Sequence, residues 1–160
     1  MLDALKNALI QVKNSDESLV GRKIDNDPVV EGLVSDLIDE VMVINSEIST
    51  VRGPHQNLIE KAKKKMEHVA ALRGRPLYHS YIGTGAGNGV FVEVEDGSVK
   101  LDLINGIGIN IMGHSNPRVM KAAVRGALSD VIMQGNLQPN NDYVKLIEKL
   151  VQIGSRASRL

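Results

Sequence analysis

The most constraining feature of this sequence is a pair of alternating apolar segments joined by Asp96-Gly97. Alternation with a period of two places every second side chain on the same face of a strand. Asp-Gly is a favoured pair at the centre of a type I′ turn, which joins antiparallel strands. The sequence therefore predicts a β-hairpin around this turn. Its alternating apolar residues are Val90, Val92, Val94, Val99, Leu101 and Leu103.

The first 75 residues carry helical patterns only. A short helix is expected first, with apolar residues spaced three and four apart: Leu2, Leu5, Leu9 and Val12. Asp27 is a good N-cap and Pro28 suits the first helical position, so a second helix is predicted to begin there. Its two adjacent apolar rows are Val29, Leu33, Leu37, Val41 and Val30, Val34, Ile38, Met42. A third helix is predicted from Gly53-Pro54 to Gly74.

Glycine-rich segments flank the hairpin. Residues 75–89 contain one proline and four glycines, which predicts a flexible connector. A second glycine-rich stretch covers residues 105–113. Asn116 and Pro117 can then cap and start a helix. A final helix is expected from Asn141 to Ile153, with Gly154 as its stop.

The composition excludes several classes of protein. With 160 residues, 42% of them hydrophobic, the chain has the length of one domain with a core. It contains no cysteine, which excludes disulfides and thiolate metal sites. Its 19 basic residues balance 19 acidic ones, so no nucleic-acid partner is expected. No apolar run is long enough for a membrane span and no signal-peptide pattern is present, so we expect a cytoplasmic protein.

The common catalytic and metal-binding motifs are absent from the sequence. The two glycine-rich stretches lack the third glycine of GxGxxG, because Asn88 and Ile111 stand at that position. The four histidines have neither the spacing nor the acidic flanks of a metal site, and no GxSxG marks a nucleophile. Glu93 and Glu95 are interpreted as ordinary surface charge. The sequence therefore predicts no catalytic residue, no cofactor-binding residue and no metal ligand.

One run of residues carries a family resemblance. Its members are Gly87, Gly89, Phe91, Asp96-Gly97, Leu101-Asp102, Gly106-Ile-Gly-Ile-Asn110, Gly113-His114 and Pro117. In order and spacing they resemble the N-terminal part of class III aminotransferases. These are the pyridoxal-phosphate enzymes of fold type I, which include acetylornithine, ornithine and lysine aminotransferases. Gly135-Asn136-Leu137 and the helix around residues 146–150 extend the similarity, which covers about residues 76–150.

The resemblance implies an α+β fold with two parts. Residues 1–75 would form a helical N-terminal extension, and residues 76–160 the N-terminal small-domain segment with its hairpin and helices. Tyr78, Ile107 and Gly108 fall where the family contacts substrate, and Asn136 falls near the dimer interface and active site. Two plainer readings remain open: Ile107 as a core strand residue, and Tyr78 as a packed or half-exposed connector aromatic.

The chain departs from the family by lacking its large domain. The Schiff-base lysine, the phosphate loop and the Asp that pairs with the pyridine nitrogen would all lie beyond Leu160, and none of the 11 lysines has a matching context. We therefore expect an N-terminal fragment of an aminotransferase that is inactive alone. Pyridoxal phosphate, an amino acid and a 2-oxo acid would be bound by the intact enzyme, and the chain alone is expected to bind no cofactor. The family is dimeric, so a homo-oligomer is the default.

An alternative of another class remains open. The chain would then be a helical oligomerisation or protein-interaction module without catalysis, using the wide apolar face of residues 29–48. The two hypotheses predict different burial of the apolar faces near the end of the chain. A fragment should leave the apolar faces of residues 119–128 and 146–151 without partners, whereas an evolved module should bury them.

Overall fold

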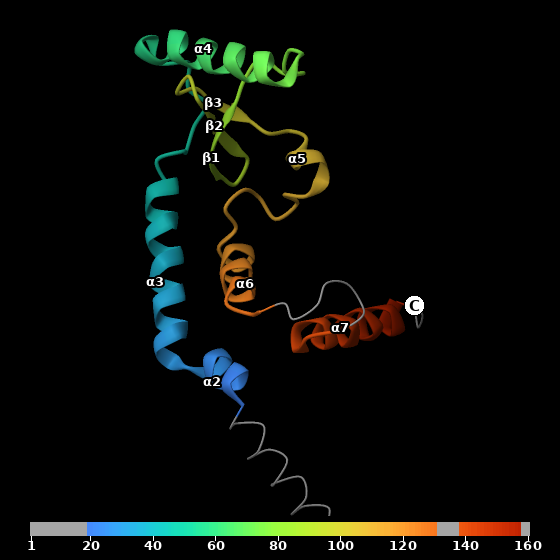
Figure 1. Cartoon of the computed structure of the whole chain (residues 1–160). Coiled ribbons are helices and arrows are strands. Elements are labelled where there is room, and N and C mark those ends of the chain that lie inside the picture. Colours follow the sequence, from blue (N-terminus) through green and yellow to red (C-terminus); the bar gives the residue numbers. More distant parts are fainter. Residues whose placement is uncertain (1–18, 131–137, 158–160) are drawn as a thin grey trace, which may run out of the picture. The chain divides into compact units, whose positions relative to one another are not determined.

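The computed structural model describes residues 19–130 and 138–157, whose helices and strands are labelled in Figure 1. The chain divides into two compact units, Met1–Arg125 and Gly126–Leu160, which are described separately. Helices and a small antiparallel sheet occur together, which confirms the α+β class. The elements are α2 (Val20–Asn26), α3 (Pro28–Asn45), α4 (Gln56–Arg73), β1 (Gly83–Asn88), β2 (Phe91–Val94), β3 (Val99–Leu101), α5 (Asn105–Gly108), α6 (Pro117–Ala127) and α7 (Asn141–Ala157).

Helix α3 begins where its capping residues predict. The Asp27 side chain accepts hydrogen bonds from the backbone N–H groups of Val29 at 2.8 Å and Val30 at 3.1 Å. These bonds satisfy two donors that a helix start would otherwise leave without partners. Helix α2, directly before it, is not predicted by the sequence, and the helix expected over residues 2–12 lies outside the described residues.

Helix α4 ends as predicted but begins later. Gly74 closes it with a left-handed φ of 70°, and the N–H of Arg75 reaches back to the Ala70 carbonyl. The predicted start at Gly53-Pro54 is displaced to Gln56 because the preceding residues are tied to the hairpin. The His55 N–H donates to the Asp96 carbonyl at 2.9 Å, which holds residue 55 in an extended conformation.

The predicted hairpin is confirmed, but its turn is of another type. β2 and β3 pair antiparallel, with Val92 opposite Lys100. Among the turn residues Glu95, Asp96 and Gly97, only Gly97 has a positive φ, whereas a type I′ turn needs two such residues. Gly97 N–H donates to the Val94 carbonyl and Val94 N–H to the Ser98 carbonyl. This is a three-residue loop with a glycine bulge.

The prediction of a flexible connector over residues 75–89 is wrong. Six of its residues form β1, which pairs antiparallel with β2 to give the sheet order β1-β2-β3. The register shifts between Gly83 and Gly87, so the strand is irregular. Glycine disfavours a strand in general, but it is required where another segment approaches closely. That requirement applies to Gly87, as described below.

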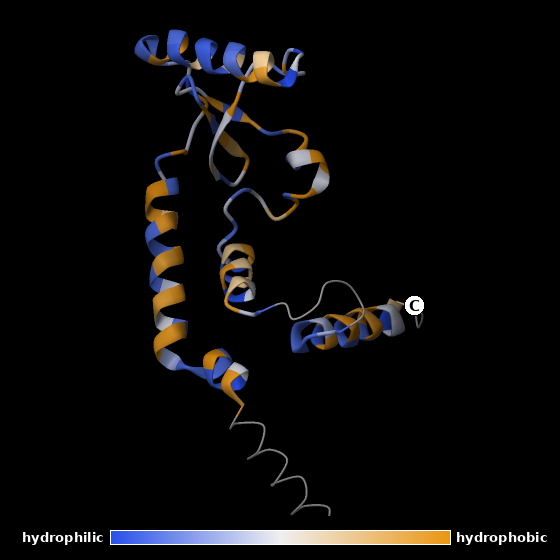
Figure 2. Ribbon diagram, in the orientation of Figure 1, coloured by the Kyte–Doolittle hydropathy of each residue, from blue (hydrophilic) through white to orange (hydrophobic). Residues whose placement is uncertain are grey.

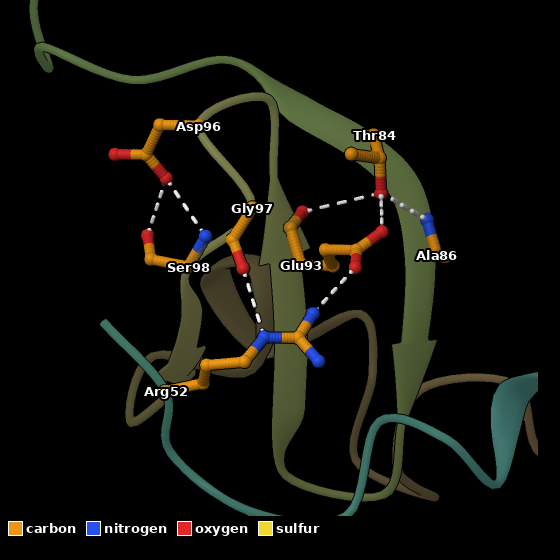
Figure 3. A network of polar contacts seen from close by, with 7 residues as sticks. All are labelled: Arg52, Thr84, Ala86, Glu93, Asp96, Gly97 and Ser98. Atoms are coloured by element: carbon orange, nitrogen blue, oxygen red, sulfur yellow. Dashed lines mark hydrogen bonds and ion pairs between the residues drawn. The ribbon is translucent and has the colours of Figure 1, made fainter. Parts of the chain in front are cut away.

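The loop before α4 covers the outer edge of β3. The Arg52 backbone exchanges two hydrogen bonds with Val99, at 3.2 and 3.0 Å. Its guanidinium donates to the Gly97 carbonyl at 2.9 Å and pairs with Glu93 at 2.8 Å (Figure 3). Thr84 of β1 also donates to Glu93, at 3.1 Å. Glu93 is thus a half-buried link between three segments rather than ordinary surface charge, and Glu95 is paired with Lys65.

The buried apolar core is small. It is contributed by α3, α4, the loop between them, β2 and β3, and consists of Val34, Ile38, Ile48, Ala62, Val94 and Val99. Of the two apolar rows on α3, one points into this core, whereas Val29, Leu33 and Leu37 of the other are more than half exposed. Figure 2 shows apolar colour along much of α3. The hairpin is covered near its turn, while Leu101 and Leu103 are exposed.

Two charged contacts connect α3 with α6. Glu31 accepts a hydrogen bond from Lys121, which holds the pKa of the Glu31 carboxyl below its usual value. Lys121 also donates to the Ser35 hydroxyl at 3.0 Å. Arg125 Nη1 lies 3.3 Å from Glu31, close enough for an ion pair but without hydrogen-bond geometry. Both helices belong to the first unit up to residue 125.

The last two helices form as predicted, except at the end of α7. Asn116 caps α6 by accepting from the N–H groups of Arg118 and Val119. α7 begins at Asn141, but it runs through the predicted stop at Gly154 to Ala157. A glycine inside a helix costs only about 1 kcal/mol relative to alanine, so neighbouring helix formers can carry the helix past it. Within the described part of the chain, no helix is both long and apolar enough to cross a membrane.

We predict that Asp27→Ala lowers the free energy of unfolding by about 1 kcal/mol, because α3 loses its N-terminal cap. Urea unfolding followed by circular dichroism measures the change. Asp39→Ala, an exposed position within the same helix, removes the same charge without a cap and is the control. Equal effects of the two substitutions would contradict the capping role.

Candidate functional site

Asp102, at the end of β3, is the centre of a small hydrogen-bond network. Its Oδ1 accepts from the Ile104 N–H at 3.0 Å, and its Oδ2 accepts from the Gly106 N–H at 2.9 Å. Oδ2 also lies 2.7 Å from His114 Nε2. An ionised carboxylate can only accept, so His114 donates this bond. The bond to His114 is the main cause that lowers the pKa of Asp102 below its usual value.

His114 is fixed by backbone contacts of its own. Its N–H donates to the Gly89 carbonyl at 2.8 Å, and its carbonyl accepts from the Gly89 N–H at 3.1 Å. The Asp102 and His114 side chains are only 15% and 21% exposed. The pair is therefore held between the β1–β2 connection and the end of β3.

Absent side chains make this close packing possible. A Cβ at Gly87 would lie 2.9 Å from both the His114 Cβ and the Phe91 carbonyl oxygen. A Cβ at Gly113 would lie 3.2 Å from the Cα of Gly89. Ordinary carbon contacts are about 3.5–4.0 Å, so Gly87 has no room for a side chain, and a side chain at Gly113 would require Gly89 to move by a few tenths of an ångström. Gly87, Gly113 and His114 thus form one tightly packed node, which also brings Asp102 to the base of the next loop.

The four residues of α5, which follow Asp102 closely, form a left-handed turn and not a regular right-handed helix. Four consecutive residues have positive φ angles: Asn105 at 52°, Gly106 at 58°, Ile107 at 62° and Gly108 at 82°. Glycine adopts this region freely, whereas a β-branched residue such as Ile107 does so rarely. Backbone strain of this kind concentrates at functional sites. The turn is therefore a candidate functional element.

The predicted substrate-contacting residues are partly brought together. Ile107 and Gly108 are adjacent in this turn, and the Ile107 side chain is 89% exposed. This exposure does not fit the plainer reading of Ile107 as a core strand residue. Tyr78 is 94% exposed, so it is neither packed nor half-exposed, and its ring contact is with the neighbouring His79. Asn136 lies outside the described residues. Substrate contact by these residues stays a prediction.

An open pocket of about 460 Å³ lies beside the loop. Its apolar walls come from α3, the glycine-rich loop and α6, and its polar groups are asparagines and Ser115. Asn45, 7% exposed, donates to the Ser115 hydroxyl at 3.0 Å. The residues that line the pocket are Val41, Asn45, Gly85, Ala86, Ile109, Asn110, Met112, Gly113, Ser115, Asn116, Val119 and Met120.

This pocket does not fit pyridoxal phosphate. Binding would need an amine for the cofactor aldehyde and cationic or backbone N–H groups for its phosphate. No lysine or arginine lines the pocket. Lys121, on the nearby helix α6, is engaged by Glu31 and Ser35. Among residues 19–130 and 138–157, no group of three or more potential ligands could hold a metal ion either.

Sequence reasoning missed the residues at the centre of this arrangement. Asp102 and His114 are part of the resemblance, but motif analysis assigned neither of them a role. One local signal was present, because an aspartate followed by a turn often accepts hydrogen bonds from the N–H groups after it. The contact to His114, 12 residues away, carries no local pattern. The same holds for Asn45 and Ser115, which are 70 residues apart.

We predict that Gly87→Ala destabilises the protein by roughly 1–3 kcal/mol, because the new methyl group overlaps His114 and the Phe91 carbonyl. Gly83→Ala in the same strand is the matched control, because its Cβ would meet nothing nearer than 3.8 Å. Thermal unfolding of both variants measures the difference. A Gly87→Ala protein as stable as Gly83→Ala would refute the close approach.

We predict that Asp102→Asn destabilises the protein at neutral pH, because the new amide group must face at least one hydrogen-bond donor. The native pKa of Asp102 is lowered, so its carboxylate stabilises the fold above the unfolded value of about 3.9. That contribution is lost as the pH falls through the lowered native pKa. The difference between Asp102→Asn and the unmodified protein should therefore shrink below about pH 4.

Unfolding free energies measured between pH 7 and pH 2 test this dependence. Asp39→Asn, exposed on α3, controls for the change in net charge. A difference between Asp102→Asn and the unmodified chain that stays constant over the whole range would contradict the role of the ionised carboxylate.

Comparison with curated proteins finds similarity to acetylornithine aminotransferases. The protein from Mycobacterium tuberculosis is 33% identical over 72 residues, which cover 45% of this chain and 18% of that protein. The Mycolicibacterium smegmatis protein is 37% identical over 73 residues, 45% of this chain and 18% of its own length. The Aquifex aeolicus protein is 33% identical over 66 residues, or 41% and 17% of the two chains.

The chain thus spans less than a fifth of the length of these curated relatives. No family model matches the chain, and no solved structure matches it. What the comparisons establish is a partial similarity, over under half of this chain, to acetylornithine aminotransferases.

Proposed function

We propose that this chain is an N-terminal segment of a class III, pyridoxal-phosphate-dependent aminotransferase. The observation that carries the proposal is the convergence of resemblance-bearing residues in one place. Gly87, Gly89, Asp102, Gly113 and His114 are scattered over 28 positions, yet they meet in the node below the left-handed turn. The partial identity to acetylornithine aminotransferases supports the same reading.

In the intact enzyme, this segment would supply substrate contacts rather than catalytic groups. The turn would present Ile107 and Gly108 to the substrate. By the same resemblance, Tyr78 would be a further substrate contact, and Asn136 would belong to the part of the enzyme near the dimer interface and active site. When bound, pyridoxal phosphate supplies the electron sink for amino-group transfer between an amino acid and a 2-oxo acid. Residues outside this chain would hold that cofactor, because the described pocket offers it neither an amine nor a cation. The chain alone is therefore expected to be inactive.

The exposed helices support the reading as a segment. Neither α6 nor α7 contains a single buried residue, although both are strongly amphipathic. Apolar residues at the predicted positions 119, 128, 146, 147, 150 and 151 are between 42% and 63% exposed. Amphipathic helices in proteins normally bury their apolar side. We infer that further parts of the enzyme, in a cytoplasmic homo-oligomer, cover these faces.

The second candidate is the interaction module without catalysis. The observation in its favour is the exposed row Val29, Leu33 and Leu37 on α3. It explains the helical part of the chain, but it gives no reason for the glycine node or for the strained turn. A module should also bury α6 and α7 within itself, which the exposure of their apolar residues disfavours.

A grafted enzyme tests the proposed function. The segment of the Mycobacterium tuberculosis acetylornithine aminotransferase that aligns with this chain is replaced by the corresponding residues from here, and its aminotransferase activity is measured. We expect activity within about tenfold of the parent enzyme, because a segment that makes substrate contacts from equivalent backbone positions keeps most of the transition-state stabilisation.

The control is a second graft that also carries Ile107→Asp. We expect this change to raise the KM for the amino donor, because a charge replaces an apolar contact. Val144→Ala, at an exposed apolar position on α7, should leave the KM unchanged. A graft that folds and assembles like the parent but has no activity would refute the aminotransferase reading and favour the interaction module.

A further inference from the structure

We propose that Asp102 and His114 are positioning residues for the aminotransferase substrate, acting by holding the left-handed turn that carries Ile107. The inference rests on the proposed function and extends it to two residues that do not themselves contact substrate. Their side chains lie beneath the turn, while Ile107 lies at its exposed surface. Three observations lead to this assignment.

The first observation is that the turn is unfavourable in isolation. Ile107 is β-branched and holds a positive φ angle of 62°, a region that asparagine and glycine tolerate but that a β-branched residue rarely adopts. Such conformations persist in non-glycine residues only when surrounding contacts enforce them. Ile107 makes little contact with the rest of the protein, since the residue is 89% exposed. The force that holds the turn must therefore act on its backbone.

The second observation is where that backbone is held. Asp102 accepts from the N–H groups of Ile104 and Gly106, which lie on either side of Asn105. Further backbone bonds close the turn, from Gly108 N–H to the Ile104 carbonyl and from Asn110 N–H to the Asn105 carbonyl. Asp102 is the side chain that ties this turn to the sheet, because it follows β3 directly.

The third observation is that His114 fixes Asp102 in turn. A carboxylate bound only to the turn could rotate together with it. The 2.7 Å bond to His114 Nε2 prevents this, because His114 is bound on both sides of its backbone to Gly89. The close approach of Gly87 to the His114 Cβ leaves the imidazole little freedom to move. Gly87 therefore makes room for His114, His114 holds the Asp102 carboxylate, and Asp102 holds the backbone of the turn.

This arrangement gives the turn a fixed shape and leaves its tip free for a ligand. Ile104 and Ile109 flank Ile107 and are 66% and 80% exposed, so the tip is apolar. An apolar tip suits the methylene part of an amino-acid substrate. Catalysis depends on such contacts being held within about 1 Å of the productive geometry. Asp102 and His114 would hold the backbone of the turn in that geometry.

Amide hydrogen exchange on the chain itself tests the mechanical half of the proposal. His114→Phe keeps a ring but removes the donor, and it should speed exchange at the Ile104 and Gly106 amides by about tenfold or more. His114→Gln retains an N–H donor and should recover part of the protection. The Ile38 amide, in the core, reports whether the fold is intact.

Asp96→Asn is the matched control for this experiment. Asp96 also accepts from a residue two positions on, with its Oδ1 bound to the Ser98 N–H at 2.9 Å, but it lies in the hairpin turn. Its substitution should leave exchange at Ile104 and Gly106 unchanged. Unchanged exchange in His114→Phe, with Ile38 protected as before, would overturn the proposal.

The grafted aminotransferase tests the functional half. His114→Phe should lower kcat/KM mainly through a higher KM for the amino donor, and His114→Gln should restore part of it. If His114 acts through Ile107, the effect of His114→Phe should largely disappear in an Ile107→Ala background. Simple additivity of the two changes would overturn the positioning role and leave the proposed function standing. An inactive graft would instead overturn the proposed function, and with it the use of the turn for substrate.

Discussion

The carboxylate of Asp102 is the interaction on which the most unusual part of this structure depends. It accepts hydrogen bonds from two backbone amides of the turn and from the imidazole of His114. A charged acceptor gains more from each bond than a neutral one, and its partial burial keeps water from competing. The sheet brings the aspartate to this position, and the glycines let the histidine reach it. One network of hydrogen bonds and close contacts therefore connects the hairpin, the glycine-rich strand and the left-handed turn.

Local chemistry made several helix boundaries predictable, although not α2 or the end of α7. Asp27 with Pro28 marked the start of α3, Asn116 with Pro117 marked the start of α6, and Gly74 marked the end of α4. In each case the signal lies within a few residues of the effect. The same holds for the alternating valines of the hairpin, whose period of two is a property of each strand alone.

Long-range approach was not predictable in this way. By composition, the glycines of β1 indicate a loop. Nothing in the neighbouring sequence shows that Gly87 must make room for His114, which lies 27 residues further on. The turn at Asp96-Gly97 shows the same limit on a smaller scale, since Asp-Gly suits two loop types and the pairing of whole strands selects one. At the candidate site, Ile107 and Gly108 could be named from the resemblance, whereas the support beneath them depends on a contact that no local pattern encodes.

The covering of one sheet edge by Arg52 has a consequence for pairing with other chains. A free strand edge offers a row of unpaired backbone groups to any other extended chain. On the β3 side this row is interrupted at Val99, whose backbone pairs with that of Arg52, and the Arg52 guanidinium is anchored to Gly97 and Glu93 (Figure 3). On the other side the sheet ends in Gly83–Asn88, an irregular strand rich in glycine, which is uncommon in strands. Of the two edges, the β3 side is therefore the one where an incoming extended chain would first have to displace a bonded segment of the same protein.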